Sequence, residues 1–414
     1  MKNRLDASAL YYVLFLSTIF GLLLGGMVLF SAADYQVNAQ FEMESKLRDN
    51  ADSGIAYAQV HFNDLLKEDE VVIDLFGEAI DTVKLRAKKW GLMTIIQSEA
   101  VHGANKVKKS ALAVPQFKKK LPNLFIPDHG RPLSLAGDTR IEGHVVIPKT
   151  GLKRAYIEGQ NYTGGKLLHG THEDAPRNLP AFDLSILNFE TLSKGEWQEW
   201  NTRTTDSINH PFDQSPIHFL SDGPLVLENV SLSNNIILEA KDSIFIDASA
   251  QLSNVIVKSP VIHIASGFRG HAQLIASKHI RLEPDAILEY PSALIIREEQ
   301  AVKGDQTFIE IGTNCQVLGA ILLSAAQPDF RNLPLLKIEE EASVHGFVYS
   351  QGKTSLKGKI NGHLYTEKFY LKTAASAYEN HLLNARIENR LPEGFALINP
   401  LEKPKRLTIM KWLQ

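Results

Sequence analysis

The chain has 414 residues, a formal net charge of −3 at pH 7 and a single cysteine, Cys315. This balance gives no electrostatic case for a nucleic-acid partner, because nucleic acids are bound by basic surfaces. One cysteine excludes an internal disulfide and a cysteine-rich zinc site, and its place in an apolar run predicts a buried, inert thiol. The length allows two or three domains.

The first predicted element is a membrane-spanning helix. Residues 9–30 carry no charged side chain and are long enough to cross a bilayer, which requires ~20 apolar residues. Lys2 and Arg4 precede this span, whereas three acidic residues come before the first downstream cation, Lys46. Since positive residues favour the cytoplasmic side, we expect a single uncleaved span in a bacterial inner membrane, with the bulk of the chain outside the cytoplasm. Small residues at 31–33 leave a cleaved signal peptide open as an alternative.

The helix is predicted to continue beyond the membrane. Apolar residues recur every three or four positions, as they do on one face of an α-helix. They are Val37, Phe41, Leu47, Ala51, Ile55, Ala58, Phe62 and Leu66. Gly54 lies within this stretch, where glycine costs ~1 kcal/mol relative to alanine. We assign residues 1–67 to a transmembrane anchor and an amphipathic helix.

Short strands are predicted to follow the helix, and the tight connection Trp90-Gly91 separates two of them. Apolar and basic residues alternate from 83 to 88, which indicates a sheet with one wet face. We expect residues 68–120 to form a small antiparallel sheet packed on the helix, because so small a sheet needs a cover. Its strand candidates are 71–76, 82–87, 92–96 and 111–114.

A basic stretch lies near the end of this predicted sheet. It contains Lys106, Lys108, Lys109 and the three lysines at 118–120. We interpret it as a solvated loop rather than a binding patch.

An apolar first half, an amphipathic second half and a following strand meander resemble type IV pilins and the pseudopilins of type II secretion. Residues 50–58 (NADSGIAYA) are similar to the segment that follows the anchor in some large minor pilin-like proteins. The resemblance implies an assembly protein outside the cytoplasm. The chain departs from the family in that no Gly-Phe-type cleavage site precedes the span and no glutamate lies near its start.

Residues 225–371 carry short apolar runs separated by polar corners. Two ladders follow from the numbering, 236/255/274/294 and 244/262/280, so the repeat is about 18–20 residues, within the solenoid range. The runs are too short for helices and rich in β-branched residues, which indicates strands. One such coil cannot bury its apolar face alone, whereas stacked neighbours can. We predict a parallel β-solenoid over residues 121–373, with an antiparallel β-sandwich as the alternative.

Two segments depart from the repeat. Residues 137–159 show the solenoid pattern, but 167–216 form a polar, aperiodic excursion, with a helix expected at 183–193. A ligand site, if present, is expected where this excursion lies on the solenoid wall, because long loops are often functional. Residues 374–414 are predicted to form a C-terminal cap, with a helix at 374–383.

Gly346, Gly352 and Gly358 are spaced by six, and we expect them at solenoid corners, where glycine adopts positive φ without a clash. The Gly-x-hydrophobic pattern at 345–364, with a related segment at 141–145, resembles bactofilins, bacterial β-helix proteins that form polymers. The resemblance implies a structural role.

The sequence contains no phosphate-binding loop, no zinc-protease helix and no nucleophile elbow. His169 and His172, followed by Glu173 and Asp174, are the best metal-like group, but two histidines in a polar loop are interpreted as surface residues. The remaining candidates are His263 and His279, one repeat apart, and the corner carboxylates Asp242, Asp247, Glu283 and Asp285. We therefore assign no catalytic, cofactor-binding or metal-binding residue, expect no cofactor and predict that the protein is not an enzyme.

The predicted function is that of a membrane-anchored structural or assembly protein of a bacterial envelope, pilin-like or secretion-associated. The expected partners are the membrane and envelope, secretion or pilus proteins, with self-association left open and no nucleic acid. The alternative is a surface β-helix protein that binds carbohydrate or cleaves polysaccharide. Aromatic residues in a line beside paired carboxylates would favour that alternative.

Overall fold

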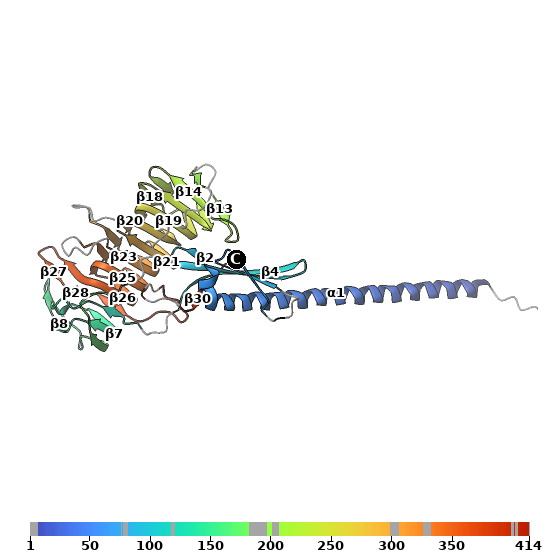
Figure 1. The fold of residues 1–414 in the computed structure, drawn as a ribbon, viewed down its shortest axis with the longest axis horizontal. Coiled ribbons are helices and arrows are strands. Elements are labelled where there is room, and N and C mark those ends of the chain that lie inside the picture. The colour runs from blue at the N-terminus through green and yellow to red at the C-terminus, as the bar shows by residue number, and fades with distance from the viewer. Residues whose placement is uncertain are drawn as a thin grey trace, which may run out of the picture.

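The computed structural model shows a mainly β protein with one long helix and a small antiparallel sheet (Figure 1). The predicted helix at 183–193 and the lysines at 118–120 lie outside the residues that the structure describes. The described residues are 7–75, 77, 82–116, 121–181, 197–200, 207–298, 306–325, 333–398, 401 and 405–413.

Helix α1 (Ala7–Leu65) extends far from the body of the molecule (Figure 1). Its amino-terminal part, with residues 9–30, is exposed throughout and is long and apolar enough to cross a membrane. Contact with the body begins at the partly buried Met43, and the fully buried side chains follow the predicted stripe as Leu47, Ala51, Ile55, Ala58 and Phe62. The helix thus continues unbroken from the apolar segment into the body.

Gly54 allows α1 to approach the sheet closely. A Cβ atom at this position would lie 2.2 Å from Ser98 Oγ and 2.7 Å from Val83 Cγ1. A glycine inside the helix is therefore required by packing, although it weakens the helix locally.

The small sheet has the strand order β1-β2-β3-β4-β30, and all of its pairs are antiparallel. One face packs on α1 through Val83, Leu85 and Ile96, and the other packs on the large β body through Trp90 and Leu112. The end of the sheet near Trp90 is thus buried on both sides, whereas Arg86 and Lys88 of β2 are exposed. Its strands are β1 (Val71–Ile73), β2 (Thr82–Trp90), β3 (Met93–His102), β4 (Asn105–Pro115) and β30 (Leu407–Leu413).

The turn at Gly91 connects β2 to β3, which confirms the predicted connection. The interpretation of Lys106, Lys108 and Lys109 as loop residues is wrong, because all three lie in β4. The prediction went wrong because lysine is depleted in strands. In the structure, each of these lysines forms an ion pair with a carboxylate of a neighbouring element.

The large β body is built of parallel strands, and we call it the stack. Its first part comprises β5 (Leu124–Phe125), β6 (Leu133–Ala136), β7 (Arg140–Ile147), β8 (Leu152–Arg154), the hairpin β9 (Tyr156–Ile157) and β10 (Gln160–Asn161), β11 (His169–Asp174), β12 (Trp197–Glu199), β13 (Ser207–His210), β14 (Ile217–Ser221), β15 (Leu225–Leu227), β16 (Ser231–Asn234), β17 (Ile236–Ala240) and β18 (Ser243–Ile246). Longer strands follow: β19 (Gln251–Ile264), β20 (Arg269–Leu282), β21 (Ile287–Arg297), β22 (Phe308–Ile311), β23 (Gln316–Ser324), β24 (Leu335–Ile338), β25 (Ser343–Leu356) and β26 (Lys359–Lys372), then β27 (Ala377–Glu379), β28 (His381–Leu383) and β29 (Arg386–Glu388).

Register in the stack follows the predicted repeat from β14 to β21, where paired residues are 17–20 positions apart, but later paired strands such as β21 and β23 are offset by 27–29 positions. The ladder Ile244, Ile262 and Ile280 is confirmed, because these residues are paired on β18, β19 and β20. The other ladder is wrong at one step: Val255 pairs with Ala272 rather than Leu274, because β19 and β20 are offset by 17 or 18 residues, whereas this ladder requires 19. The pairing is parallel, so the antiparallel sandwich is wrong for the described strands.

The chain does not build the stack from one end to the other. Strand β5 pairs with both β26 and β7, and β29 also pairs with β7, so the early strands lie beyond the late ones. In Figure 1 the green β7 and β8 accordingly lie next to the orange-red β26 and β28, while β13 and β14 lie at the opposite end. Residues 137–159 therefore do not precede β12 in the spatial order of the stack, but lie beyond β26 and β29. The excursion connects these early strands to the opposite end of the stack.

The prediction that residues 374–414 form a C-terminal cap with a helix is also wrong. Residues 377–388 form β27, β28 and β29, and β28 pairs with β6, so the predicted helix at 374–383 is absent. A helix this short is marginal in water, whereas the neighbouring strands offer backbone partners. Strand β30 completes the small sheet because Leu407 and Ile409 add to the apolar face under α1.

Apolar triplets arise because one wall of the stack is buried on both sides. Ile236 and Leu238 point into the core of the stack, whereas Ile237 between them packs with Trp90 and Leu112 of the sheet. We call this wall the covered face.

Gly346 lies between Gly319 and Gly362 on paired strands, and a Cβ atom on Gly346 would lie 1.9 Å from the Gly319 carbonyl oxygen. Its φ of 136° confirms the expected positive φ, at a position inside β25, but Gly352 and Gly358 do not have positive φ. Gly352 instead lies close to the Pro334 carbonyl group, and Gly358 lies close to that of Ala342. The spacing of six therefore does not place the three glycines in one row of paired residues.

Candidate functional site

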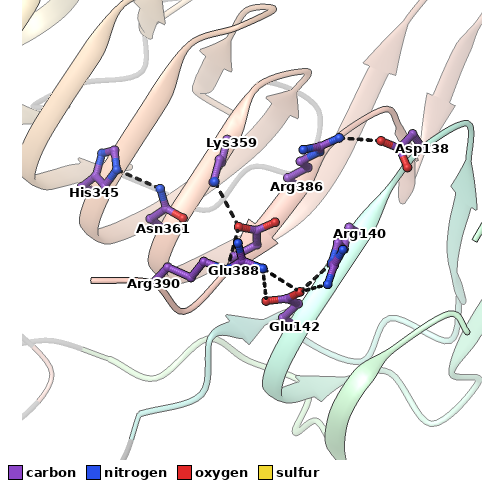
Figure 2. Close-up of polar contacts among 9 residues, drawn as sticks. All are labelled: Asp138, Arg140, Glu142, His345, Lys359, Asn361, Arg386, Glu388 and Arg390. Carbon is purple, nitrogen blue, oxygen red and sulfur yellow. Dashed lines mark hydrogen bonds and ion pairs between the residues drawn. The ribbon is translucent and has the colours of Figure 1, made fainter. Parts of the chain in front are cut away.

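Polar side chains gather where the last strands of the stack meet the early strand β7, and we call this junction the seam. His345, Asn361 and Glu388 occupy paired positions on β25, β26 and β29. The pairing of β29 with β7 continues this row to Glu142. Figure 2 shows the row beside the basic residues Lys359, Arg386, Arg140 and Arg390.

Glu388 is the most deeply buried charge of the seam, with a side chain that is 3% exposed. Lys359 Nζ lies 3.0 Å from its Oε2, and Arg390 Nε lies 3.4 Å from the same oxygen. Arg390 also reaches Glu142, where Nη2 lies 3.3 Å from Oε1. One guanidinium therefore links two strands whose residues lie far apart in the sequence.

Glu142 also pairs with Arg140 on its own strand. Burial by itself would raise the pKa of Glu142, but the guanidinium groups of Arg140 and Arg390 hold this pKa below its ordinary value. The Arg386 side chain donates to Asp138 Oδ2 at 2.6 Å, which raises the pKa of Arg386. A general acid requires a carboxyl group whose pKa is raised, so these ion pairs are suited to joining strands rather than to proton transfer.

Asn361 and His345 lie at one end of the polar row in the seam (Figure 2). Asn361 Nδ2 lies 2.8 Å from His345 Nε2, and Asn361 is 4% exposed. Burial, together with the neighbouring Lys359, lowers the pKa of His345. The neutral imidazole can then accept the amide hydrogen.

A second polar group lies between the stack and the small sheet. Lys411 Nζ lies 2.8 Å from His271 Nε2 and 3.4 Å from Asn254 Oδ1. Burial, with a further contribution from Lys411, lowers the pKa of His271 to about 4. His271 is therefore neutral near pH 7 and accepts a hydrogen bond from the ammonium group.

The predicted metal-like group is not assembled. His169 and His172 lie on β11, where residues three apart point to opposite faces of the strand, and both are exposed. Among the residues that the structure describes, no group of three or more metal-ligating side chains occurs.

His263 and His279 are not neighbours, because His263 is paired with Arg281 and His279 with Val261. Each has its own partner: His263 Nε2 lies 2.7 Å from Glu283 Oε1, and His279 stacks on Phe308.

The corner carboxylates also remain apart and serve local structure. Asp247 accepts hydrogen bonds from the Ser249 backbone and side chain, and Asp285 accepts one from Asn314. Asp242 is exposed in a turn.

Cys315 is fully buried, and its Sγ donates to the Glu283 carbonyl oxygen at 3.0 Å. Burial raises the pKa of this thiol to about 11, so the prediction of an inert cysteine is confirmed.

Some described parts of the excursion lie along the covered face, including Ala175, Leu179 and Phe212. Tyr349 donates its hydroxyl to the Pro180 carbonyl, and Phe212 packs edge-on against Trp90. Asp213 pairs with Lys108 and helps to line a pocket of about 20 Å³ on the small sheet. This volume holds about one water molecule and is too small for a sugar ring.

The seam was missed by motif reasoning, although the sequence carries a signal for it. The tripeptide Arg-Ile-Glu occurs at 140–142 and again at 386–388, and the structure pairs the two copies in register. A search for identical short strands, rather than for a fixed period, would have found this pair.

Comparison of the chain with known protein families, with characterised proteins and with solved structures gave no match. The molecule is thus defined by its own geometry, as a mainly β protein with one helix fit to span a membrane.

Proposed function

We propose that this chain is a membrane-anchored structural or assembly protein of a bacterial envelope that presents a parallel β-solenoid to protein partners outside the cytoplasm. The observation that carries the proposal is the continuity of α1. Its apolar part is exposed, and the same helix enters the body at Met43 without a break. The body is therefore held at a defined orientation on its anchor.

Packing supports a rigid connection. The small sheet lies between α1 and the stack, and Gly54 brings the helix into close contact with Ser98. A flexible linker would instead leave exposed polar chain between the anchor and the body.

The solenoid assignment is part of this proposal. It is supported by parallel pairing between residues about one repeat apart, as in Ile244, Ile262 and Ile280. It is also supported by the close backbone approach at Gly346 and by an apolar core inside the strands. Each coil buries its apolar face against the next.

Assembly is favoured over polysaccharide cleavage because the carboxylates of the seam are paired with cations. Glu388 has Lys359 and Arg390 as partners, and Glu142 has Arg140 and Arg390. Glycoside cleavage requires one carboxyl group that retains its proton and a second nearby carboxylate.

The end of the stack at β11 favours a body of fixed length. Inward positions on β7 are held by the buried Val145 and Ile147, but the paired positions on β11 are held by the exposed His172 and Asp174. A further coil on this end would bury these polar side chains, which is unfavourable without partners. We therefore do not extend the proposal to end-to-end polymers at β11.

The test is a topology measurement on the full chain in its producing bacterium. We expect the protein to stay with membranes after alkaline extraction and to be digested by protease added to spheroplasts. A variant in which residues 9–30 are replaced by a cleavable signal peptide serves as the soluble control. A native protein found in the soluble fraction, cleaved after Ala33, would overturn the anchor.

A further inference from the structure

Two edge strands, β11 in the stack and β30 in the small sheet, differ in the side chains that they expose. Within the described residues, β11 pairs only with β7, and all six of its residues are exposed, including two histidines and two acidic residues. Charged and polar side chains of this kind protect an edge from pairing with other strands. Strand β30 also has one described partner, β4, but its sequence is LTIMKWL.

β30 exposes little charge to solvent, and its edge protection consists of a bulge between Ile409 and Lys411 and one inward charge. Lys411 is its one charged residue, and this side chain turns inward to His271 rather than toward solvent. Trp412 is 51% exposed, although it belongs to a strand at the border of a sheet. Long apolar edges are blunted in natural proteins unless they are paired or covered.

The backbone direction of β30 can be followed from Leu407 to Ile409, before the bulge. The Gln116 amide donates to the Arg406 carbonyl, so the next residue, Leu407, directs its backbone away from β4. The same alternation directs Ile409 away from β4. Gln59 Nε2 donates to the Leu407 carbonyl at 3.2 Å, whereas the outward groups of Ile409 have no backbone partner among the described residues.

We infer that β30 is a docking edge for an extended segment of a different protein, which adds a strand to the small sheet. Strand addition supplies backbone hydrogen bonds, and side-chain contacts at alternate positions supply specificity. Trp412 provides an aromatic surface for apolar residues of the segment. Lys405 and Arg406 are exposed just before β30, and no ion pair joins them to another described residue, so an acidic residue fits opposite them.

The direction of β30 favours a partner that itself leaves the membrane. Leu407 at the start of the strand lies at Gln59, whereas Leu413 at its end is paired with Ser110, next to Lys109 and its partner Asp52. The strand therefore runs opposite to α1. A chain that emerges from the bilayer beside α1 runs antiparallel to β30, and antiparallel pairing is slightly more stable than parallel pairing.

A second copy of this chain does not fit the same edge in the antiparallel mode. Two such copies would be related by a two-fold axis perpendicular to the shared sheet. That axis reverses the direction of α1, so the two membrane spans would point in opposite directions. The occupant is therefore a different chain, and a homodimer is one outcome of the test.

The experiment uses the purified full-length protein in detergent micelles and a synthetic probe. The probe is a seven-residue peptide of alternating valine and threonine with an acidic residue at its carboxyl end. Its matched control carries N-methyl groups at alternate residues, which removes the donors on one edge. We expect the probe to bind and to slow hydrogen exchange in residues 407–413, whereas the methylated peptide does neither.

Two variants locate the binding edge. Trp412→Lys places a charge on β30, and we expect it to raise the dissociation constant of the probe about tenfold or more. Val72→Lys makes the same change on β1, the opposite edge of the sheet, at a residue that is 55% exposed, and we expect no effect. Equal effects of the two variants, absent binding, or binding of the methylated peptide would each overturn the inference.

A photo-crosslinking amino acid at position 412 or 72 of the full-length protein extends the test to cells. We expect an adduct with a different protein from position 412 alone, whereas an adduct of two copies of this chain would overturn the inference. The inference rests on the proposed function, but its failure is distinguishable. A soluble protein that still binds the probe would remove the anchor and retain the docking edge.

Discussion

Gln273 and Trp90 are joined across the interface between the stack and the small sheet. Gln273 Nε2 donates to the Trp90 carbonyl at 2.8 Å, and its Oε1 accepts from the Leu92 amide at 2.8 Å. Gln273 is 3% exposed and lies between Ile256 and Ala293 on neighbouring strands. One buried amide therefore fixes the β2–β3 turn, and with it the sheet that packs on α1, against the covered face.

Gln273→Leu should destabilise the protein by about 2 kcal/mol, because it leaves one buried donor and one buried acceptor without partners. Urea unfolding of the detergent-solubilised protein, followed by Trp fluorescence, measures the loss. Gln251→Leu, at an exposed position of the neighbouring strand β19, is the matched control. Similar midpoints for the two variants would show that the amide does not hold the interface.

Gly346→Ala should be strongly destabilising, by about 3 kcal/mol or more, because the added Cβ meets the Gly319 carbonyl and the residue keeps a positive φ. Gly223→Ala has open space around the new methyl group and should change stability little. Thermal unfolding by circular dichroism compares the two. A tolerated Gly346→Ala would mean that the coils can separate at this position.

Glu388→Gln should reduce stability by about 1–3 kcal/mol, because it removes a buried carboxylate that forms ion pairs with Lys359 and Arg390. Glu340→Gln, whose side chain is 72% exposed, should have a much smaller effect. Equilibrium unfolding at low and high salt measures both. An equal loss in the two variants would remove the seam as a stabilising contact.

Acid should weaken the interface between the sheet and the stack through His271. The folded-state pKa of His271 is lowered to about 4 from its ordinary value of 6.5, so only the unfolded chain binds this proton between these values. The contribution of neutral His271 to the free energy of unfolding is fully present above pH 6.5 and is lost progressively toward pH 4. The total loss is about 3 kcal/mol, at ~1.4 kcal/mol per pH unit. His218, His345 and His363 also have pKa values lowered first by burial and act in the same direction.

Unfolding midpoints between pH 7.5 and 4.5 test this dependence. His271→Gln should flatten the slope in this range relative to the native chain, although it also changes stability at neutral pH. His172→Gln, at an exposed position of β11, should leave the slope unchanged. A native slope that His271→Gln does not alter would assign the acid sensitivity to other groups.

Local sequence was sufficient for the features that local physics decides. The exposed apolar segment and the buried stripe from Leu47 to Phe62 follow from composition and the helical period. The Trp90-Gly91 turn, the ladder through Ile262 and the inert Cys315 follow in the same way. Each depends on residues that are neighbours along the chain or one repeat apart.

The tertiary structure alone decided which distant segments meet. Arg386 reaches Asp138 across 248 positions, and Gln59 reaches Leu407 across 348. The entropy of closing a loop rises only slowly with its length, so sequence distance hardly favours a near partner over a far one. Many apolar or charged segments can pair locally with similar free energy. The native choice is made by the simultaneous fit of all coils, the sheet and α1, which no single stretch of residues encodes.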